Sequence, residues 1–241
     1  MNYSESKWNG FKKIDFEFED RQAILVCPET PAKGNKWLFK TEYFGAFPEF
    51  EIEMLKRGYY VAYLHNITRW CLPQDISSKP RFCDFLIREF GLAKQCMPVG
   101  MSCGGMHAIY FAAEYPQYVA AMYIDAPVLN LLSTPCGVGN SDDSMYCEFV
   151  EATGYTVIDM INYRNHPIDR VEEIIKSNIP VFMVCGDSDT VVPYLENGKL
   201  LSDKFKKYGG NLTEVLKAGC NHHPHGLEDN KPLIDFTLKY Y

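Results

Sequence analysis

Short apolar runs alternate with longer amphipathic segments along most of the chain. Near the amino end, KKIDFEFED places Ile14, Phe16 and Phe18 on one face and charged residues on the other. This period of two predicts a half-exposed strand that pairs antiparallel with the strand after it. Continuous apolar runs of four to eight residues are typical of strands covered on both faces. Such runs occupy residues 23–28, 59–65, 97–101, 120–126, 180–186 and 212–218.

Helical patterns fill most of the gaps between these runs. They cover residues 43–56, 80–90, 103–114, 194–208 and 233–240. Strands that alternate with helices predict parallel βαβ units, in which helices cover both faces of one sheet. We therefore expect an α/β fold with a mostly parallel central sheet.

The connection over residues 127–179 is much longer than one crossover helix requires. We expect it to form a small helical cap over the carboxyl edge of the sheet. With 241 residues, no internal repeat and no linker, the chain is predicted to form a single domain over 1–241.

Composition narrows the class of protein further. The formal net charge of −7 argues against binding to a phosphate backbone, so no nucleic-acid partner is expected. No segment approaches the roughly 18 apolar residues of a membrane span, and the amino end lacks the apolar run of a signal peptide. Nine cysteines without a C-x-x-C pair fit reduced thiols. We expect a cytoplasmic protein with no membrane partner.

A candidate nucleophile follows the apolar run at 97–101. The sequence GMSCG at 100–104 fits G-x-S-x-G and lies between a predicted strand and a predicted helix. This context is typical of a sharp turn that exposes Ser102 beside the amino end of a helix, where backbone N–H groups can stabilise an oxyanion. The alternative is a glycine-rich turn that serves only the strand-to-helix geometry.

A candidate acid follows the run at 180–186, in GDSDTVVP. The carboxyl ends of parallel strands meet at one sheet edge, so this loop should lie near Ser102. Asp189 lies further into the loop than Asp187, which is close enough to the strand end to serve the turn. We favour Asp189. Asp125 also ends a predicted strand, but the following Pro127 favours a role in bracing the turn.

A candidate base lies in AGCNHHPHGL, residues 218–227, just after the predicted strand at 212–218. The order Ser, Asp, His along the chain favours His222, with His223 and His225 packing or hydrogen-bonding around it. The competing interpretation is a metal site made by Cys220, His222 and His225. The chain offers no partner cluster with ligand spacing elsewhere, so we expect no metal.

Two further residues are candidates for the wall of a substrate pocket. His65 and Trp70, in YLHNITRWC, follow the predicted strand at 59–65 and should lie at the same sheet edge. Core packing or a surface loop accounts for them equally well.

Taken together, these motifs resemble the α/β-hydrolase superfamily over nearly the whole chain. A narrower resemblance is to bacterial α/β-hydrolases related to carbohydrate acetylesterases and described as prolyl-oligopeptidase-like. It depends on AILVCPETPAKGNKWLFKTEYFG, MYIDAPV, GDSDTVVPYLENG and GCNHHPHGLED.

The resemblance implies roles for individual residues. Ser102 would be the nucleophile, Asp189 the orienting acid and His222 the base. The oxyanion hole would use the backbone amides of Cys103 and of the loop near Trp37. Members of the narrower group carry an arginine at the position of Cys103 and a tryptophan near Thr134. A substrate-facing charge and ring are therefore expected to be missing here.

These observations predict a serine esterase that cleaves small acyl groups from a small-molecule ester, with acetylated saccharides as the preferred class. No cofactor is expected. A prolyl-oligopeptidase-like peptidase and a non-catalytic binding protein remain alternatives. The sequence offers no large amino-terminal propeller of the kind that restricts such peptidases to peptides. A homo-oligomer formed through exposed apolar residues of 127–179 is also left open.

Overall fold

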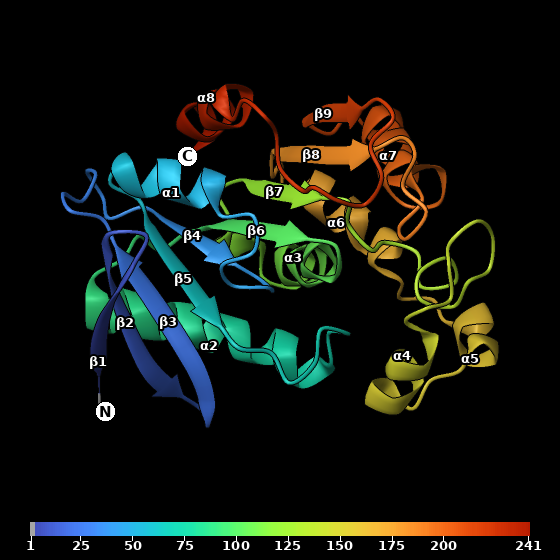
Figure 1. Cartoon of the computed structure of the whole chain (residues 1–241), viewed down its shortest axis with the longest axis horizontal. Coiled ribbons are helices and arrows are strands. Elements are labelled where there is room, and N and C mark those ends of the chain that lie inside the picture. The colour runs from blue at the N-terminus through green and yellow to red at the C-terminus, as the bar shows by residue number, and fades with distance from the viewer. Residues whose placement is uncertain (1–2) are drawn as a thin grey trace.

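The computed structural model describes residues 3–241, which form one nine-stranded sheet with helices on both faces (Figure 1). The strand order is β1-β2-β3-β5-β4-β6-β7-β8-β9. β1, β2 and β3 form antiparallel pairs, as does β3 with β5, whereas all pairs from β5 to β9 are parallel. The predicted α/β fold with a mostly parallel sheet is thus confirmed. The strands are β1 (Ser4–Trp8), β2 (Phe11–Phe18), β3 (Arg21–Cys27), β4 (Trp37–Lys40), β5 (Tyr60–Leu64), β6 (Met97–Met101), β7 (Met122–Asp125), β8 (Val181–Gly186) and β9 (Leu212–Lys217).

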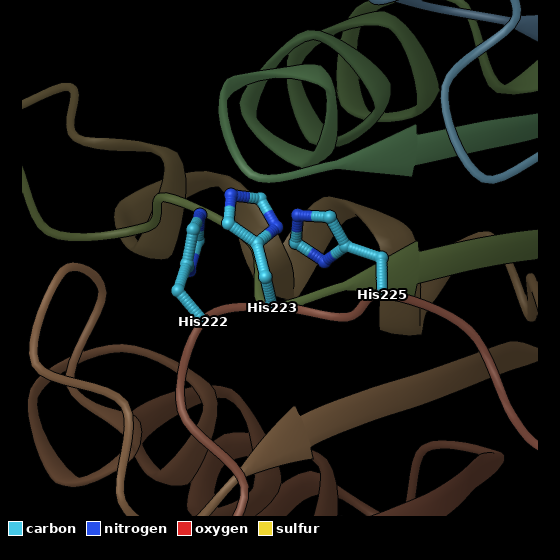
Figure 2. Close-up of side chains that lie close together, drawn as sticks. All are labelled: His222, His223 and His225. Carbon is cyan, nitrogen blue, oxygen red and sulfur yellow. The ribbon is translucent and has the colours of Figure 1, made fainter.

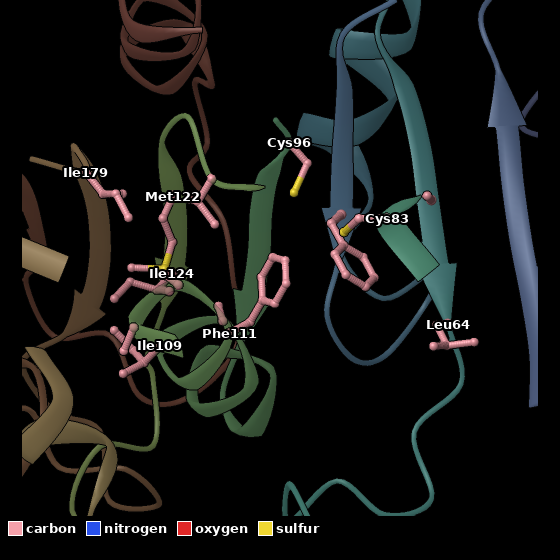
Figure 3. Packing of buried hydrophobic residues seen from close by; sticks show 14 of the residues in the cluster. Leu64, Cys83, Cys96, Ile109, Phe111, Met122, Ile124 and Ile179 are labelled. Atoms are coloured by element: carbon pink, nitrogen blue, oxygen red, sulfur yellow. The ribbon is translucent and has the colours of Figure 1, made fainter. Parts of the chain in front are cut away.

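Two hydrophobic layers hold the helices against the sheet. One face packs against α1 and α8, and the other against α2, α3, α6 and α7. Successive residues of a strand point to opposite faces, so in β7 Met122 and Ile124 join one layer while Tyr123 joins the other. Figure 3 shows Met122 and Ile124 beside Ile109 and Phe111 of α3. The helices are α1 (Glu49–Lys56), α2 (Pro73–Phe90), α3 (Cys103–Glu114), α4 (Tyr146–Thr153), α5 (Val157–Asn162), α6 (Val171–Lys176), α7 (Gly198–Tyr208) and α8 (Lys231–Tyr240).

The sheet differs from the sequence prediction at three strands, of which β1 at the amino end was not predicted. β4, in the centre of the sheet, was not predicted, because the buried Lys40 interrupts its apolar run directly after Phe39. β3 pairs antiparallel with β2, as predicted, but it also pairs antiparallel with β5, so the parallel part of the sheet begins only at β5. Both faces of β3 are covered, with Leu25 in one hydrophobic layer and Val26 in the other, so its apolar run does not distinguish a parallel from an antiparallel strand.

α1 and α2 show the largest differences between the predicted and the observed start of a helix. α1 begins only at Glu49, because Tyr43 and Phe47 have positive φ angles that no helix accommodates. α2 begins earlier, at Pro73, where a proline at the first turn loses no hydrogen bond. Pro80, expected to start this helix, lies inside it.

The segment 127–179 contains α4, α5 and α6. Figure 1 shows α4 and α5 beyond the carboxyl ends of β6, β7 and β8, while α6 packs back against α3. Within residues 3–241, no helix combines the length and the apolar character needed to cross a membrane.

Candidate active site

Ser102 lies at the tight turn between β6 and α3. Its φ of 52° is strained for a residue with a side chain, and its backbone N–H donates to the Asp125 carbonyl at 2.8 Å. Gly100 and Gly105 permit the turn. A Cβ at Gly100 would lie 2.3 Å from the Gly104 carbonyl oxygen, and one at Gly105 would lie 2.4 Å from Cβ of Pro127. The glycines therefore allow strand and helix to approach closely enough to form the turn that carries the serine hydroxyl.

His222 connects this serine to Asp189. Its Nε2 lies 3.1 Å from the Ser102 Oγ, and its Nδ1 lies 2.8 Å from Oδ2 of Asp189. All three side chains are buried. The other oxygen of Asp189 accepts the backbone N–H groups of Val191 and Val192 at 2.9 and 2.8 Å. This carboxylate is therefore fixed in position and can hold the imidazole with Nε2 facing the serine.

The other candidate acids have different partners. Asp187 is exposed, and its Oδ1 accepts the backbone N–H of Gly219 at 2.7 Å, so it braces the turn. Asp125 is buried and contacts Nδ1 of His225 at 2.6 Å, while its other oxygen accepts the Tyr123 hydroxyl and the Gly226 N–H. Of these three aspartates, only Asp189 contacts His222.

The expected position of Trp37 is wrong. Trp37 begins β4 and is fully buried, at the opposite end of the strand from the serine. Its backbone N–H donates to the Tyr241 hydroxyl at 3.0 Å, so it cannot face an oxyanion. Because the prediction missed β4, it placed this residue in a loop.

With Trp37 excluded, two other backbone amides near the serine are candidates for the oxyanion hole. Cys103 is the first residue of α3, so its N–H has no partner within the helix. Tyr43 follows the carboxyl end of β4 and lines the same cavity as Ser102. In residues 3–241 the N–H of Tyr43 has no hydrogen-bond acceptor. Burial raises the pKa of the Cys103 thiol to about 11, so at neutral pH this side chain is not a competing thiolate.

A cavity of about 330 Å³ opens beside Ser102. Its lining is mostly apolar, with one cation, Arg69. The Arg69 Nε donates to Glu148 of α4 at 2.7 Å, and a second guanidinium nitrogen contacts the other oxygen of the same carboxylate. A charge beside the serine was expected to be missing, but Arg69 contributes one to the cavity lining from another loop. The lining residues are Tyr43, Ala46, Phe47, Arg69, Met101, Ser102, Met145, Val191, His222, His223 and His225.

Neither predicted wall residue lines this cavity. His65 is exposed, and its backbone N–H donates to the Gln22 carbonyl, which places it on the β3 side of the sheet. Trp70 is buried, donates its indole N–H to Glu148 at 3.1 Å and lines a separate cavity of about 160 Å³. The surface-loop interpretation holds for His65, and the packing interpretation holds for Trp70.

Sequence reasoning missed Tyr43, Phe47 and Arg69. Tyr43 and Phe47 were placed in a helix because their apolar spacing continues that of α1. Arg69 is adjacent to Trp70, and the only signal for it was its position after β5. Tyr43 and Arg69 lie within stretches that the sequence analysis quoted, but nothing in those stretches assigned either residue a role, so the tertiary structure identifies them.

The fold together with the Ser102 turn defines an α/β-hydrolase of the serine hydrolase class. A family model then makes the assignment narrower. The model of the prolyl oligopeptidase family matches residues 82–240, more than half of the chain, so this chain belongs to that family.

Solved structures with the same fold include peptidases and an esterase. The acylaminoacyl peptidase of Pyrococcus horikoshii has a TM-score of 0.69 at 15% identity, covering 92% of this chain and 38% of its own. A puromycin hydrolase has a TM-score of 0.67 at 17% identity, covering 92% of this chain and 36% of its own. This chain thus spans under two fifths of either relative.

An S-formylglutathione hydrolase from Agrobacterium tumefaciens is similar over most of both chains. Its TM-score is 0.63 at 15% identity, covering 92% of this chain and 93% of its own. At these sequence identities, the similarity of all three structures to this chain shows a shared fold. No curated protein sequence matches the chain significantly.

Proposed function

We propose that this protein hydrolyses carboxylic esters of small acyl groups through an acyl-enzyme on Ser102. The observation that carries the proposal is the continuous contact from the Ser102 Oγ through His222 to the Asp189 carboxylate, at 3.1 and 2.8 Å. This is the arrangement in which a hydroxyl is activated by a base that a third group orients.

Each side chain has one role in the proposed reaction. Ser102 attacks the acyl carbon while His222 takes its proton at Nε2 and then delivers that proton to the leaving alcohol. Asp189 holds the Nδ1–H and stabilises the imidazolium that forms. Water then attacks the acyl-enzyme by the same route, and Ser102 is regenerated without a cofactor.

The backbone amides of Cys103 and Tyr43 are the proposed oxyanion donors. Cys103 follows Ser102 in the turn and Tyr43 lines the same cavity, and among residues 3–241 neither amide has a backbone acceptor. Each such donor contributes about 10²- to 10³-fold in rate when it faces the developing charge. Tyr43 takes the place that the sequence resemblance assigned to the region of Trp37.

The cavity supports a small, neutral acyl group. Its volume of about 330 Å³ is at the lower end for ligand pockets, and Ala46, Met101 and Val191 present apolar surface beside the serine. The positive charge of Arg69 is offset by Glu148, so an acyl group with its own charge finds no free counter-ion there. An acetyl group fits these conditions, and acetylated saccharides are the substrate class that we propose.

The segment 127–179 is proposed to act as a cap over this cavity. Met145 immediately precedes α4 and lines the cavity, while Glu148 of α4 is bonded to Arg69. These contacts connect α4 to the substrate side of Ser102.

A peptidase is the second candidate. The family match and the names of two structural relatives, an acylaminoacyl peptidase and a puromycin hydrolase, favour it. The same Ser102, His222 and Asp189 would then cleave an amide.

Hydrolysis of p-nitrophenyl esters of increasing acyl length, an acetylated xylo-oligosaccharide and a prolyl anilide tests the proposal. We expect activity to concentrate on acetyl esters and Ser102→Ala to lower turnover by up to about 10⁶. Ser188→Ala, at an exposed serine of the Asp189 loop, is the control and should retain activity.

Two results would contradict the proposal. Cleavage of the anilide but of no ester would identify a peptidase. Unchanged ester hydrolysis by folded Ser102→Ala would remove Ser102 as the nucleophile.

A further inference from the structure

The loop after β9 gathers three imidazoles beside Ser102. One ring nitrogen from each of His222, His223 and His225 lies within 4.8 Å of those of the other two. Figure 2 shows the three rings rising from one loop toward the turn between β6 and α3, with His223 between the others. The sequence-based metal alternative used Cys220 in place of His223.

Two of these histidines already have the second partner that metal-binding histidines use. Nδ1 of His222 contacts Asp189 at 2.8 Å, and Nδ1 of His225 contacts Asp125 at 2.6 Å. Both carboxylates are buried. A carboxylate on one ring nitrogen fixes the tautomer and makes the other nitrogen a better ligand. Nε2 of both rings is thereby left as the ligand atom.

His223 supplies a third nitrogen. Its ring stacks on Phe47 with centroids 5.6 Å apart and planes at 14°. Stacking covers the face of the ring and leaves its nitrogen lone pairs, which lie in the ring plane, accessible.

We propose that His222, His223 and His225 form an inhibitory site for a divalent transition metal of the zinc class. Three imidazoles suit zinc, whereas calcium and magnesium prefer oxygen ligands. Zinc bonds of about 2.0–2.1 Å in tetrahedral geometry bring ligand nitrogens to about 3.4 Å apart. The exposed His223 side chain can make most of that approach.

The carboxylates behind the rings support a doubly charged ion. Asp189 and Asp125 lie one imidazole away from the proposed ion, so their two negative charges offset its charge without being ligands. The Ser102 Oγ, 3.1 Å from Nε2 of His222, or a water, would complete the fourth position.

The proposed inhibition follows because the ion would bind the lone pair of His222 that accepts the serine proton. A metal on Nε2 of His222 occupies the electron pair that would otherwise take the Ser102 proton. No bond breaks and no redox change occurs, so removing the ion restores the enzyme. Inhibition rests on the proposed function of His222, whereas binding of the ion does not.

Equilibrium dialysis of the full chain against ZnCl₂, with metal content measured directly, tests binding. We expect one zinc per chain in the wild type and in Ser102→Ala, and no retention of magnesium. His223→Gln should weaken zinc affinity by at least about tenfold, and Asp125→Asn by about 10- to 100-fold through His225. His65→Gln, at an exposed histidine away from the cluster, is the matched control.

Inhibition is tested with p-nitrophenyl acetate, each variant being compared with its own metal-free rate. Zinc at the concentration that saturates dialysis should abolish wild-type hydrolysis, EDTA should restore it, and His223→Gln should need at least about tenfold more zinc. Absence of stoichiometric zinc, or equal affinity in His223→Gln, would overturn the site. Saturation of an active enzyme without loss of rate would overturn its inhibitory role. A chain inactive on all substrates would refute the proposed function, while dialysis would still decide whether zinc binds.

Discussion

Asp189 and Asp187 are two residues apart, yet they face different partners. Asp189 is buried against His222, with its second oxygen fixed by two backbone N–H groups. Asp187 is exposed and holds the turn at Gly219. The sequence predicted this division from position alone, because the residue nearer a strand end is more easily used by the turn.

Replacing Asp189 should therefore affect catalysis far more than replacing Asp187. Asp189→Asn leaves the shape but favours the wrong His222 tautomer, so we expect kcat on an acetyl ester to fall by about 10⁴. Asp187→Asn is the matched control, and its kcat on the same ester should fall by less than about tenfold. Equal losses in both variants would contradict the assignment of Asp189.

At the level of elements, the turn between β6 and α3 depends on close approach. A Cβ at Gly100 would meet the backbone oxygen of Gly104 at 2.3 Å, whereas the nearest atom to a Cβ at Gly104 would be the Cβ of Glu42, at 3.2 Å. A backbone atom cannot move aside by changing rotamer, as a flexible side chain can. The two glycines are therefore not equivalent, although both belong to the same motif.

Gly100→Ala should destabilise the fold by about 1–3 kcal/mol and also displace Ser102. Gly104→Ala, the control in the same turn, should lower the free energy of unfolding by clearly less. Urea denaturation of both variants measures the free energy of unfolding. The rate of ester hydrolysis reports whether Ser102 is displaced. A Gly100→Ala protein as stable and active as the wild type would show that the turn tolerates a side chain.

At the scale of the whole molecule, α4 is joined to the loop after β5 by one carboxylate. Glu148 accepts from Arg69 and from the Trp70 indole, 78 residues away along the chain. Arg69 and Glu148 are partly exposed, so such a pair contributes only about 0.2–1 kcal/mol. This is enough to change the position of α4 but not to unfold the protein.

Glu148→Gln should raise KM for an acetyl ester by about two- to fivefold and change kcat little, because the loss concerns the cavity wall. Asp203→Asn, which breaks the exposed Lys199–Asp203 pair on α7, is the control and should leave KM unchanged. A fall in kcat without a change in KM would contradict this role of α4.

The buried His107 of α3 makes the stability of the whole fold depend on pH. Its Nε2–H donates to the Arg69 carbonyl at 3.2 Å, and its Nδ1 has no partner in residues 3–241. Burial holds the pKa of His107 well below 6.5. The unfolded chain therefore binds a proton that the folded chain does not, and stability falls as the pH drops below about 6.5.

His107→Gln should remove this dependence, up to about 1.4 kcal/mol per pH unit between pH 6.5 and 5. Urea denaturation at several pH values measures the slope. His65→Gln, at an exposed side chain, is the control and should keep the wild-type slope. An unchanged slope in His107→Gln would assign the acid sensitivity to other groups.

The sequence by itself determined the α/β class, the position of the serine turn and the choice of Asp189 and His222. Each follows from local information: apolar period, glycines that permit a tight turn, and a place just after a strand. Parallel strands then bring these loops to one edge, because their carboxyl ends meet there.

The tertiary structure alone decided which residues surround the serine. Lys40 interrupts the apolar run of β4, so the strand was not predicted, Trp37 was misplaced and Tyr43 was missed. Arg69 and Glu148 meet across distant segments. The pairing of Asp125 with His225, 100 residues apart, likewise depends on how β7 and the loop after β9 pack. Contacts of this kind are set by packing between elements, and no local pattern in the sequence encodes them.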